Sequence, residues 1–328
     1  MTAGLLVRIG RWRELRILLV VVVFGLAMWL YDARFLSTAT INTILLYLAG
    51  YAIMACGMTA LLVSGGFDLS VGSVSALSAM VAAVLMKDAA IQLPWPVAVL
   101  AGLATGAAVG FLNGLAVAKL GINPFITTLA TMLLARGLTY IISGGLGRSD
   151  FGAQFCWLGQ GRMGTMQVPV VGPVAGVQMP IVISLALVAM FDLLLRKSRV
   201  FRQNYYIGGN EQAAWLSGIA VNRIKLFNYG LSGALAALAG LLFCARLDSA
   251  TPNAGEGDEL KVITAVIVGG ASLSGGKGTV FGAFLGCVLL AMIRPAISFL
   301  PIQDHWEKAV VGTILLAAVL LDRIGRKA

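Results

Sequence analysis

Ten apolar stretches constrain the fold of this chain more than any other feature. A helix needs about 20 mostly apolar residues to cross the hydrocarbon core of a bilayer. The stretches cover approximately residues 15–31, 43–63, 73–86, 95–118, 124–142, 179–195, 226–245, 259–270, 280–300 and 306–321, and those at 73–86 and 259–270 are short. The sequence therefore predicts an all-α polytopic membrane protein with about ten transmembrane helices, organised as a single transmembrane domain over residues 1–328.

Charged residues are too few for a soluble protein. They make up 12% of the chain, whereas an ordinary soluble domain carries about a quarter. This excludes an ordinary cytosolic enzyme, a disordered protein and a nucleic-acid-binding protein. The formal net charge of +10 needs another explanation, and membrane sidedness supplies one, because Lys and Arg accumulate on the cytoplasmic side.

The positions of the basic residues predict the topology. Arg8, Arg11, Arg13 and Arg16 precede or begin the first stretch, which has no small-residue cleavage pattern and is expected to remain as a helix with a cytoplasmic N-terminus. Ten spans return the C-terminus to the same side. Fifteen of the 24 basic residues then lie inside. The long loop 196–225 is expected in the cytoplasm, and loop 143–178 is expected in the periplasm with little helix.

Glycines recur every fourth residue in two places, which predicts close helix packing. The first series is Gly102, Gly106, Gly110 and Gly114, and the second is Gly278, Gly282 and Gly286.

An eight-residue pattern, GGxxLSxG, occurs twice, at residues 65–72 and 269–276. Each copy separates two apolar stretches. Either the copies are broken, re-entrant elements beside a translocation path, or they are tight turns between helices. Ser70, Ser73 or Ser274 is expected to cap the helix that follows, with Asp68 near its positive end. The turn glycines are Gly65, Gly66, Gly72, Gly269, Gly270 and Gly276.

Polar residues also lie in or beside the apolar stretches. Asn113, Thr128 and Asn228 belong to this group; Asn123 is expected to cap a helix that begins at Pro124. Such side chains either face a solute cavity or bond neighbouring helices. The candidates for the translocation path are Asp68, Ser70, Asn123, Thr127, Thr131 and Ser274. Arg136 and Arg294 are either functional intramembrane charges or snorkel to an interface.

The sequence lacks the residues that catalysis, metal binding or cofactor binding would need. His305 is the only histidine, the four cysteines have no CxxC spacing, and Gly276-Lys277-Gly278-Thr279 fails the phosphate-loop pattern. We therefore expect no catalytic residue, no metal, no cofactor and no enzyme activity in this chain.

Four motifs carry a resemblance to a known family. Residues 64–73 read SGGFDLSVGS, residues 121–129 read GINPFITTL, and residues 208–219 read GGNEQAAWLSGI. The fourth motif is the glycine-rich run from Gly269 to Gly278. In this order the motifs resemble those of permease subunits of bacterial ATP-binding-cassette sugar importers of the ribose-permease type.

The resemblance implies a monosaccharide importer in the bacterial inner membrane. Its implied partners are an ATP-binding subunit with two fused nucleotide-binding domains, a periplasmic sugar-binding protein and a second permease chain, either identical or a paralogue, within membrane lipid. It implies that a short inner helix over Glu211–Leu216 docks on the ATPase. The implied coupling residues are Gly208, Gly209, Asn210, Glu211, Trp215 and Gly218.

Rival interpretations remain open at this stage. A secondary carrier, a passive channel and an intramembrane enzyme belong to other classes. Within the importer class, the substrate is alternatively a nucleoside, a furanosyl signal or a branched-chain amino acid. The identity of the sugar does not follow from these motifs.

Overall fold

The computed structural model describes residues 2–164, 166–168, 172–174, 176–303 and 305–327. The chain divides into two compact units. Unit 1 comprises Met1–Phe67, Val188–Lys225 and Leu260–Ala328, and unit 2 comprises Asp68–Leu187 and Leu226–Glu259.

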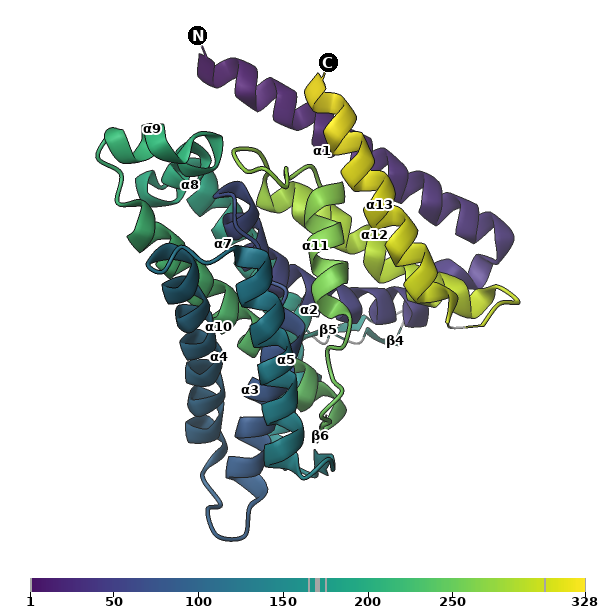
Figure 1. Cartoon of the computed structure of the whole chain (residues 1–328). Coiled ribbons are helices and arrows are strands. Elements are labelled where there is room, and N and C mark those ends of the chain that lie inside the picture. Colours follow the sequence, from purple (N-terminus) through teal and green to yellow (C-terminus); the bar gives the residue numbers. More distant parts are fainter. Residues whose placement is uncertain (1, 165, 169–171, 175, 304, 328) are drawn as a thin grey trace. The chain divides into compact units, whose positions relative to one another are not determined.

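The described residues are mostly helical (Figure 1). The helices are α1 (Thr2–Tyr31), η1 (Ala33–Leu36), α2 (Thr38–Val63), α3 (Val71–Lys87), α4 (Trp95–Ala118), α5 (Pro124–Ser143), α6 (Ala153–Gln160), α7 (Met179–Lys197), α8 (Arg199–Gly209), α9 (Glu211–Leu216), α10 (Val221–Leu247), α11 (Asp258–Val268), α12 (Val280–Phe299) and α13 (Trp306–Lys327).

Every one of the ten predicted stretches is a helix: α1 to α5, α7 and α10 to α13. Seven of these helices are long and apolar enough to cross a membrane. The other three are α3 with 17 residues, α11 with 11 and α13 with 22. The predicted fold class, an all-α polytopic membrane protein, is therefore confirmed. The division of the chain into loops 143–178 and 196–225 with assigned sides stays a prediction.

Unit 1 is built around the packing of α2 on α12, with α1 also packed against α12. Ile17 of α1 joins Leu285 and Leu289 of α12 in one buried cluster. Phe35 of η1 is fully buried and meets the ring of Phe299 edge-on, with centroids 6.0 Å apart.

Unit 2 packs α3 against α4 and α5, and Figure 1 shows α10 beside α4. The predicted glycine ridge makes the α4–α10 contact possible. A Cβ at Gly106 would meet the carbonyl oxygen of Gly233, and a Cβ at Gly110 would meet that of Tyr229. Backbones can approach this closely only where side chains are absent.

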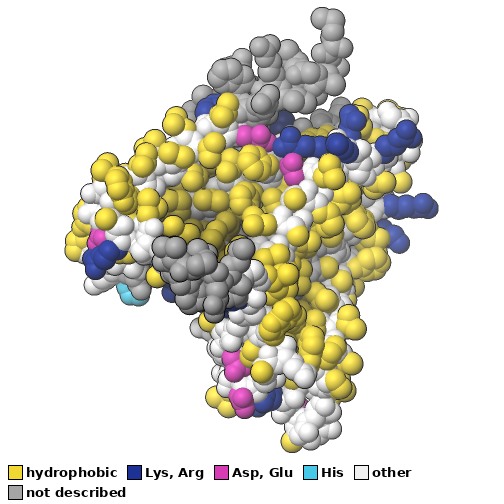
Figure 2. Space-filling view, turned by 180° about the vertical axis from the view of Figure 1, so that it is seen from behind, with side chains coloured by type: hydrophobic (Ala, Val, Ile, Leu, Met, Phe, Trp, Pro, Cys, Tyr) yellow, Lys and Arg dark blue, Asp and Glu magenta, His cyan; other side chains and the backbone are white. Residues whose placement is uncertain are grey.

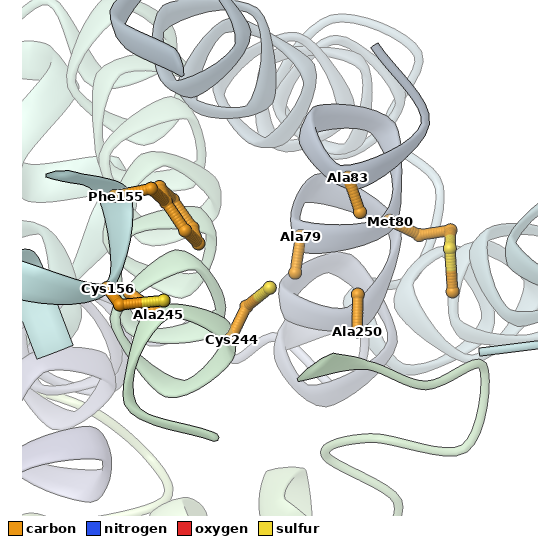
Figure 3. Close-up of a cluster of buried hydrophobic side chains, with 8 residues drawn as sticks. All are labelled: Ala79, Met80, Ala83, Phe155, Cys156, Cys244, Ala245 and Ala250. Carbon is orange, nitrogen blue, oxygen red and sulfur yellow. The ribbon is translucent and has the colours of Figure 1, made fainter. Parts of the chain in front are cut away.

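Small side chains also fill the interior of unit 2 next to α6. The cluster in Figure 3 brings Phe155 and Cys156 of α6 together with residues of α3, α10 and β6. Its members are Ala79, Met80, Ala83, Phe155, Cys156, Cys244, Ala245 and Ala250. All four cysteines are buried with free thiols.

The two long loops contain more regular structure than expected. Loop 143–178 contains α6 and five short strands, of which β1 (Arg148–Ser149) pairs antiparallel with β6 (Ser249–Ala250). The other strands are β2 (Arg162–Met163), β3 (Met166–Val168), β4 (Gly172–Val174) and β5 (Val177–Gln178), which pair β2 with β5 and β3 with β4. Part of this loop lies outside the described residues. Loop 196–225 is largely helical in α8 and α9.

Large apolar side chains are exposed along the helices, as a lipid-facing surface requires. On the face shown in Figure 2, hydrophobic side chains predominate over charged ones. On α5 alone the exposed ones include Phe125, Ile126, Leu133, Leu134 and Ile141. The chain is therefore a multi-pass membrane protein.

Candidate functional site

A continuous network of buried polar side chains connects four elements of unit 2. Asp68 Oδ1 accepts hydrogen bonds from the Ser70 amide at 2.8 Å and from Ser70 Oγ at 2.6 Å. Asn113 Nδ2 of α4 donates to Ser70 Oγ at 3.1 Å, and Thr131 Oγ1 of α5 donates to Asn113 Oδ1 at 2.6 Å. Ser232 Oγ of α10 lies 3.4 Å from Asp68 Oδ2.

The network is almost fully removed from solvent. Asp68, Asn113 and Ser232 are each 1% exposed, and Ser70 is fully buried. A buried polar group is costly unless it is hydrogen-bonded. The mutual bonding of these side chains therefore joins the elements that carry them.

Asp68 lies at the start of α3, as the sequence predicts, but the capping prediction is wrong. Ser70 occupies the position before α3 and makes no side-chain cap bond, because its hydroxyl donates to Asp68 instead. Ser73 lies inside α3, and Ser274 lies well before α12 begins. Thr279 caps α12 through a bond from the Gly282 amide at 3.0 Å.

Three of the six path candidates come together in the network: Asp68, Ser70 and Thr131. Asn123 is exposed and accepts from the Phe125 amide at 2.8 Å, so its predicted capping role is confirmed. Thr127 Oγ1 is buried and has no hydrogen-bond partner among the described residues. Ser274 is exposed, and its hydroxyl lies 3.4 Å from that of Ser272.

Sequence reasoning missed Ser232 and listed Asn113 only as one polar residue among several. Ser232 follows Asp68 by 164 residues, and no local pattern marks it. Asn113 lies between Gly110 and Gly114 on the glycine face of α4. This position is the sequence feature that could have indicated that Asn113 faces the interior.

Both copies of GGxxLSxG begin as tight turns that end a helix. After α2, the Gly66 amide donates to Leu61 O and the Gly65 amide to Leu62 O; after α11, the Ala271 amide donates to Val266 O and the Gly270 amide to Ile267 O. This is the Schellman pattern, which favours glycine in the left-handed conformation. The φ angles are +82° at Gly65 and +101° at Gly270.

The two copies differ in register. The left-handed residue is the first glycine of the pattern in one copy and the second glycine in the other. The first copy leads into α3 at Val71, whereas the second continues through Gly276 to Thr279 before α12. Gly72 lies inside α3, where a Cβ would meet Glu259 Oε2 and Gly255 O of the same unit.

The predicted coupling segment is a short helix. Residues Glu211–Leu216 form α9, and Asn210 Oδ1 accepts from the Ala213 amide at 2.9 Å, which confirms the predicted cap. A Schellman turn at Gly218 ends the helix. Lys225 Nζ lies 2.7 Å from both carboxylate oxygens of Glu211.

The outer face of α9 is apolar and exposed. Trp215 is 68% exposed and Leu216 is 77% exposed. The opposite face holds Ala214, which is buried in one cluster with Ile207 of α8 and with Val221 and Ile224 of α10. α9 is therefore attached to α8 on one side and carries two large, exposed side chains on the other.

Backbone contacts join α8 to both turn regions of unit 1. A Cβ at Gly208 would meet the carbonyl oxygen of Val63, at the end of α2, and the amide nitrogen of Gly276. A Cβ at Gly275 would lie 2.8 Å from the Gly208 Cα and 3.0 Å from the Gly65 Cα. The Gly276 amide donates to Val63 O at 2.8 Å. We call this group, Val63, Gly65, Gly208, Gly275 and Gly276, the glycine junction.

Charged residues of α1 and α7 hold the first turn of α12. Glu14 accepts from Thr279 Oγ1 at 2.8 Å and from Arg196 Nη2 at 3.2 Å. Asp192 pairs with Arg196 Nε at 2.6 Å and accepts from the Phe281 amide at 3.1 Å. Carboxylates near a helix N-terminus are stabilising.

The two arginines of uncertain role have partners within their own units. Arg136 Nη1 donates to the carbonyl oxygens of Pro252 and Ala254, both at 2.7 Å. Arg294 lies over the ring of Tyr47 and 3.9 Å from Glu307, which also pairs with Lys261 at 2.6 Å. Arg136 thus holds the loop that follows β6.

Glycine-packed helices and a buried polar network are features of polytopic membrane transport proteins. Residues 40–319 match the family described as the permease component of the branched-chain amino acid transport system. The match covers most of the chain, and this protein belongs to that family of transport-system permease components.

Relatives support the same placement. The chain is 41% identical to the ribose import permease protein RbsC of Escherichia coli K12 over 275 residues, which cover 83% of this chain and 81% of the relative. It is 37% identical to the L-arabinose transport system permease protein AraH of E. coli K12, with 97% and 92% covered. It is 34% identical to the galactose/methyl galactoside import permease protein MglC of Salmonella typhimurium, with 96% and 94% covered.

Proposed function

We propose that this chain is the permease subunit of an ATP-driven importer that moves a monosaccharide across the bacterial inner membrane. The observation that carries the proposal is its similarity, over nearly the whole chain, to permeases named for ribose, arabinose and galactose. The substrate is a pentose, hexose or deoxyhexose delivered by a periplasmic binding protein.

ATP hydrolysis belongs to a partner chain in this proposal, and the permease itself is not an enzyme. Membership of the family implies an ATP-binding partner and a substrate-binding partner. We assign the first a pair of fused nucleotide-binding domains, and we place a second permease chain, identical or paralogous, beside this one. Both termini lie in the cytoplasm, as the distribution of basic residues indicates.

α9 is the element proposed to contact the ATP-binding chain. Its exposed Trp215 and Leu216 are suited to an apolar groove, because buried aromatic residues dominate the energy of protein interfaces. The Ala214 side is occupied by α8 and α10. Docking on the outer side therefore leaves the internal packing of unit 1 intact.

The polar face of α5 is proposed to border the translocation path. Thr127 and Thr131 are four residues apart and share a helix face. Thr127 Oγ1 is buried and has no partner among the described residues, so it could bond a sugar hydroxyl once the helices around it part. Asp68 and Ser70 support this face through Asn113, which bonds both Ser70 and Thr131.

Uptake by the reconstituted transporter tests the function. The permease is placed in liposomes with its ATP-binding and solute-binding partner chains, and radiolabelled ribose, L-arabinose, galactose and leucine are offered in turn. We expect ATP-dependent uptake of a sugar. Uptake without the ATP-binding chain would refute the proposal, and uptake of leucine alone would favour the amino acid named in the family's description.

A matched pair of tryptophan variants tests the docking of α9. Trp215→Ala is expected to weaken co-purification of the ATP-binding chain by about tenfold or more, because a central aromatic side chain typically contributes 2 kcal/mol or more to an interface. Trp157→Ala, at a 53% exposed tryptophan of α6, is the control and should co-purify normally. Equal co-purification of both variants would contradict the docking role.

A further inference from the structure

We propose that Gly208 is the position at which movement of α8 and α9 is transmitted to the end of α2 and to the loop before α12. The inference rests on the proposed function, since it assigns a path to the movement that the ATP-binding chain imposes on α9. It concerns the glycine junction, which brings together three sequence motifs that are remote in the chain.

α8 and α9 are connected firmly enough to move as one body. Ile207 of α8 and Ala214 of α9 are 2% and 4% exposed and share one apolar cluster. Only Asn210 separates the two helices, and its side chain caps α9 while its amide donates to Tyr206 O at 3.0 Å. A displacement of α9 therefore displaces the C-terminal end of α8.

The end of α8 contacts its neighbours through backbone atoms. A Cβ at Gly208 would meet Val63 O, the Gly276 amide nitrogen and the Gly275 Cα, which all lie close to the same point of α8. A backbone contact has no rotatable side chain that could absorb a displacement, whereas contacts between long side chains adjust by changing rotamers. Movement of Gly208 therefore moves both the end of α2 and the loop 275–279.

A second contact strengthens the connection to that loop. Tyr205 Oη, one turn before Gly209 on α8, donates to the carbonyl oxygen of Gly278 at 2.8 Å. Thr279 follows directly and both caps α12 and bonds Glu14. The loop is thus held by α8 at one end and by α12 and α1 at the other.

The two elements that Gly208 contacts, the end of α2 and the loop before α12, are also connected to each other. α2 and α12 form the main helix contact of unit 1, and Gly276 is bonded to Val63 at 2.8 Å. A methyl group at position 208 would enter the space beside this hydrogen bond. Because the atoms it meets belong to the backbone, the turns or α8 must shift to accommodate it.

The test compares Gly208→Ala with Gly50→Ala in the complete transporter reconstituted in liposomes. Gly50 lies in α2, and a Cβ there would meet no atom within 4 Å. The measurement is the amount of sugar taken up per ATP hydrolysed, using whichever of ribose, L-arabinose or galactose the unmodified transporter imports. We expect Gly208→Ala to lower this ratio by about tenfold, while Gly50→Ala leaves it unchanged.

The ratio separates transmission from mere destabilisation. A variant that only folds poorly yields fewer transporters, but each survivor imports the normal amount of sugar per ATP. An unchanged ratio for Gly208→Ala would overturn the inference. If Gly208→Ala does not assemble, Tyr205→Phe removes only the hydroxyl that reaches Gly278, and it should lower the ratio by about twofold or more; an unchanged ratio there would equally overturn it.

Failure of the proposed function gives a different result. Absence of ATP-dependent sugar uptake by the unmodified transporter would refute the function. Normal uptake by the unmodified transporter together with a normal ratio for the variants would refute only the role of the glycine junction.

Discussion

Replacing Asp68 with alanine should destabilise the permease more than any other single change in the buried polar network. Asp68 accepts two short hydrogen bonds from Ser70, at 2.8 Å and 2.6 Å, and is 1% exposed. Truncation leaves the buried Ser70 amide and hydroxyl without this acceptor, and each buried unsatisfied donor costs about 1–3 kcal/mol, so the expected loss in the free energy of unfolding is about 3 kcal/mol.

The third contact of Asp68 supplies an internal comparison. Ser232 Oγ lies 3.4 Å from Asp68 Oδ2, which is long for a bond between oxygen atoms. Ser232→Ala should therefore cost only about 0.5 kcal/mol. Asp68→Asn keeps the volume and one acceptor oxygen, and its cost should fall between those of the two alanine variants.

Unfolding of the purified permease by sodium dodecyl sulfate in mixed micelles, followed by circular dichroism, measures these differences. The order Asp68→Ala, Asp68→Asn, Ser232→Ala is the expected result. A cost below about 1 kcal/mol for Asp68→Ala would show that the network does not hold these elements together. Equal losses in the free energy of unfolding for Asp68→Ala and Ser232→Ala would show that the hydrogen-bond lengths do not predict the relative strengths of these contacts.

Two further predictions concern unit 2. Gly106→Ala places a methyl group against Gly233 O of α10 and should lower the free energy of unfolding by about 1–3 kcal/mol. The control Gly137→Ala on α5 would meet no atom within 4 Å and should be neutral or slightly stabilising. The same unfolding assay measures both, and equal effects would contradict the glycine ridge. The hydrogen bond from the Phe151 amide, aided by Cys156 Sγ and Lys87, holds the pKa of the Asp248 carboxyl below its usual 3.8. A lowered folded-state pKa stabilises above the unfolded value and is lost as the pH falls through the folded value, so protection of the Phe151 amide from hydrogen exchange should decline below about pH 4 in the natural protein. In Asp248→Asn this decline should be absent; an identical pH profile in both proteins would refute the assignment.

The local features of the candidate site follow from short-range rules. Asn123 and Asn210 cap the helices that begin after them, as their side chains and positions predict. The GG pairs end α2 and α11, because glycine adopts the left-handed conformation that closes a Schellman turn. The exposed Trp215 on a six-residue helix likewise matches the segment that the family resemblance indicated.

The partners within the site did not follow from such rules. The sequence groups Asp68 with Asn123 and Ser274 as path candidates, but it does not reveal that Asp68 contacts Ser70 and Ser232 or that Ser70 bonds Asn113. The serine before α3 resembles a cap in sequence, but its hydroxyl has a nearby carboxylate as an alternative acceptor. The sequence around Arg136 does not predict that two carbonyl groups more than 110 residues later accept its hydrogen bonds.

Hydrophobic length and glycine spacing thus determined the class of the protein, its ten main helices and the packing face of α4, because these depend on the periodicity of a single helix and on the thickness of a bilayer. Tertiary structure alone decided which remote segments share a contact. Gly65, Gly208 and Gly275 belong to three separate motifs, and only the folded backbone brings them together in the glycine junction. The contact needs the absence of a Cβ at Gly208 and Gly275, whereas Gly65 is required by its φ of +82°. Neither requirement leaves a periodic signal by which the sequence could reveal the pairing.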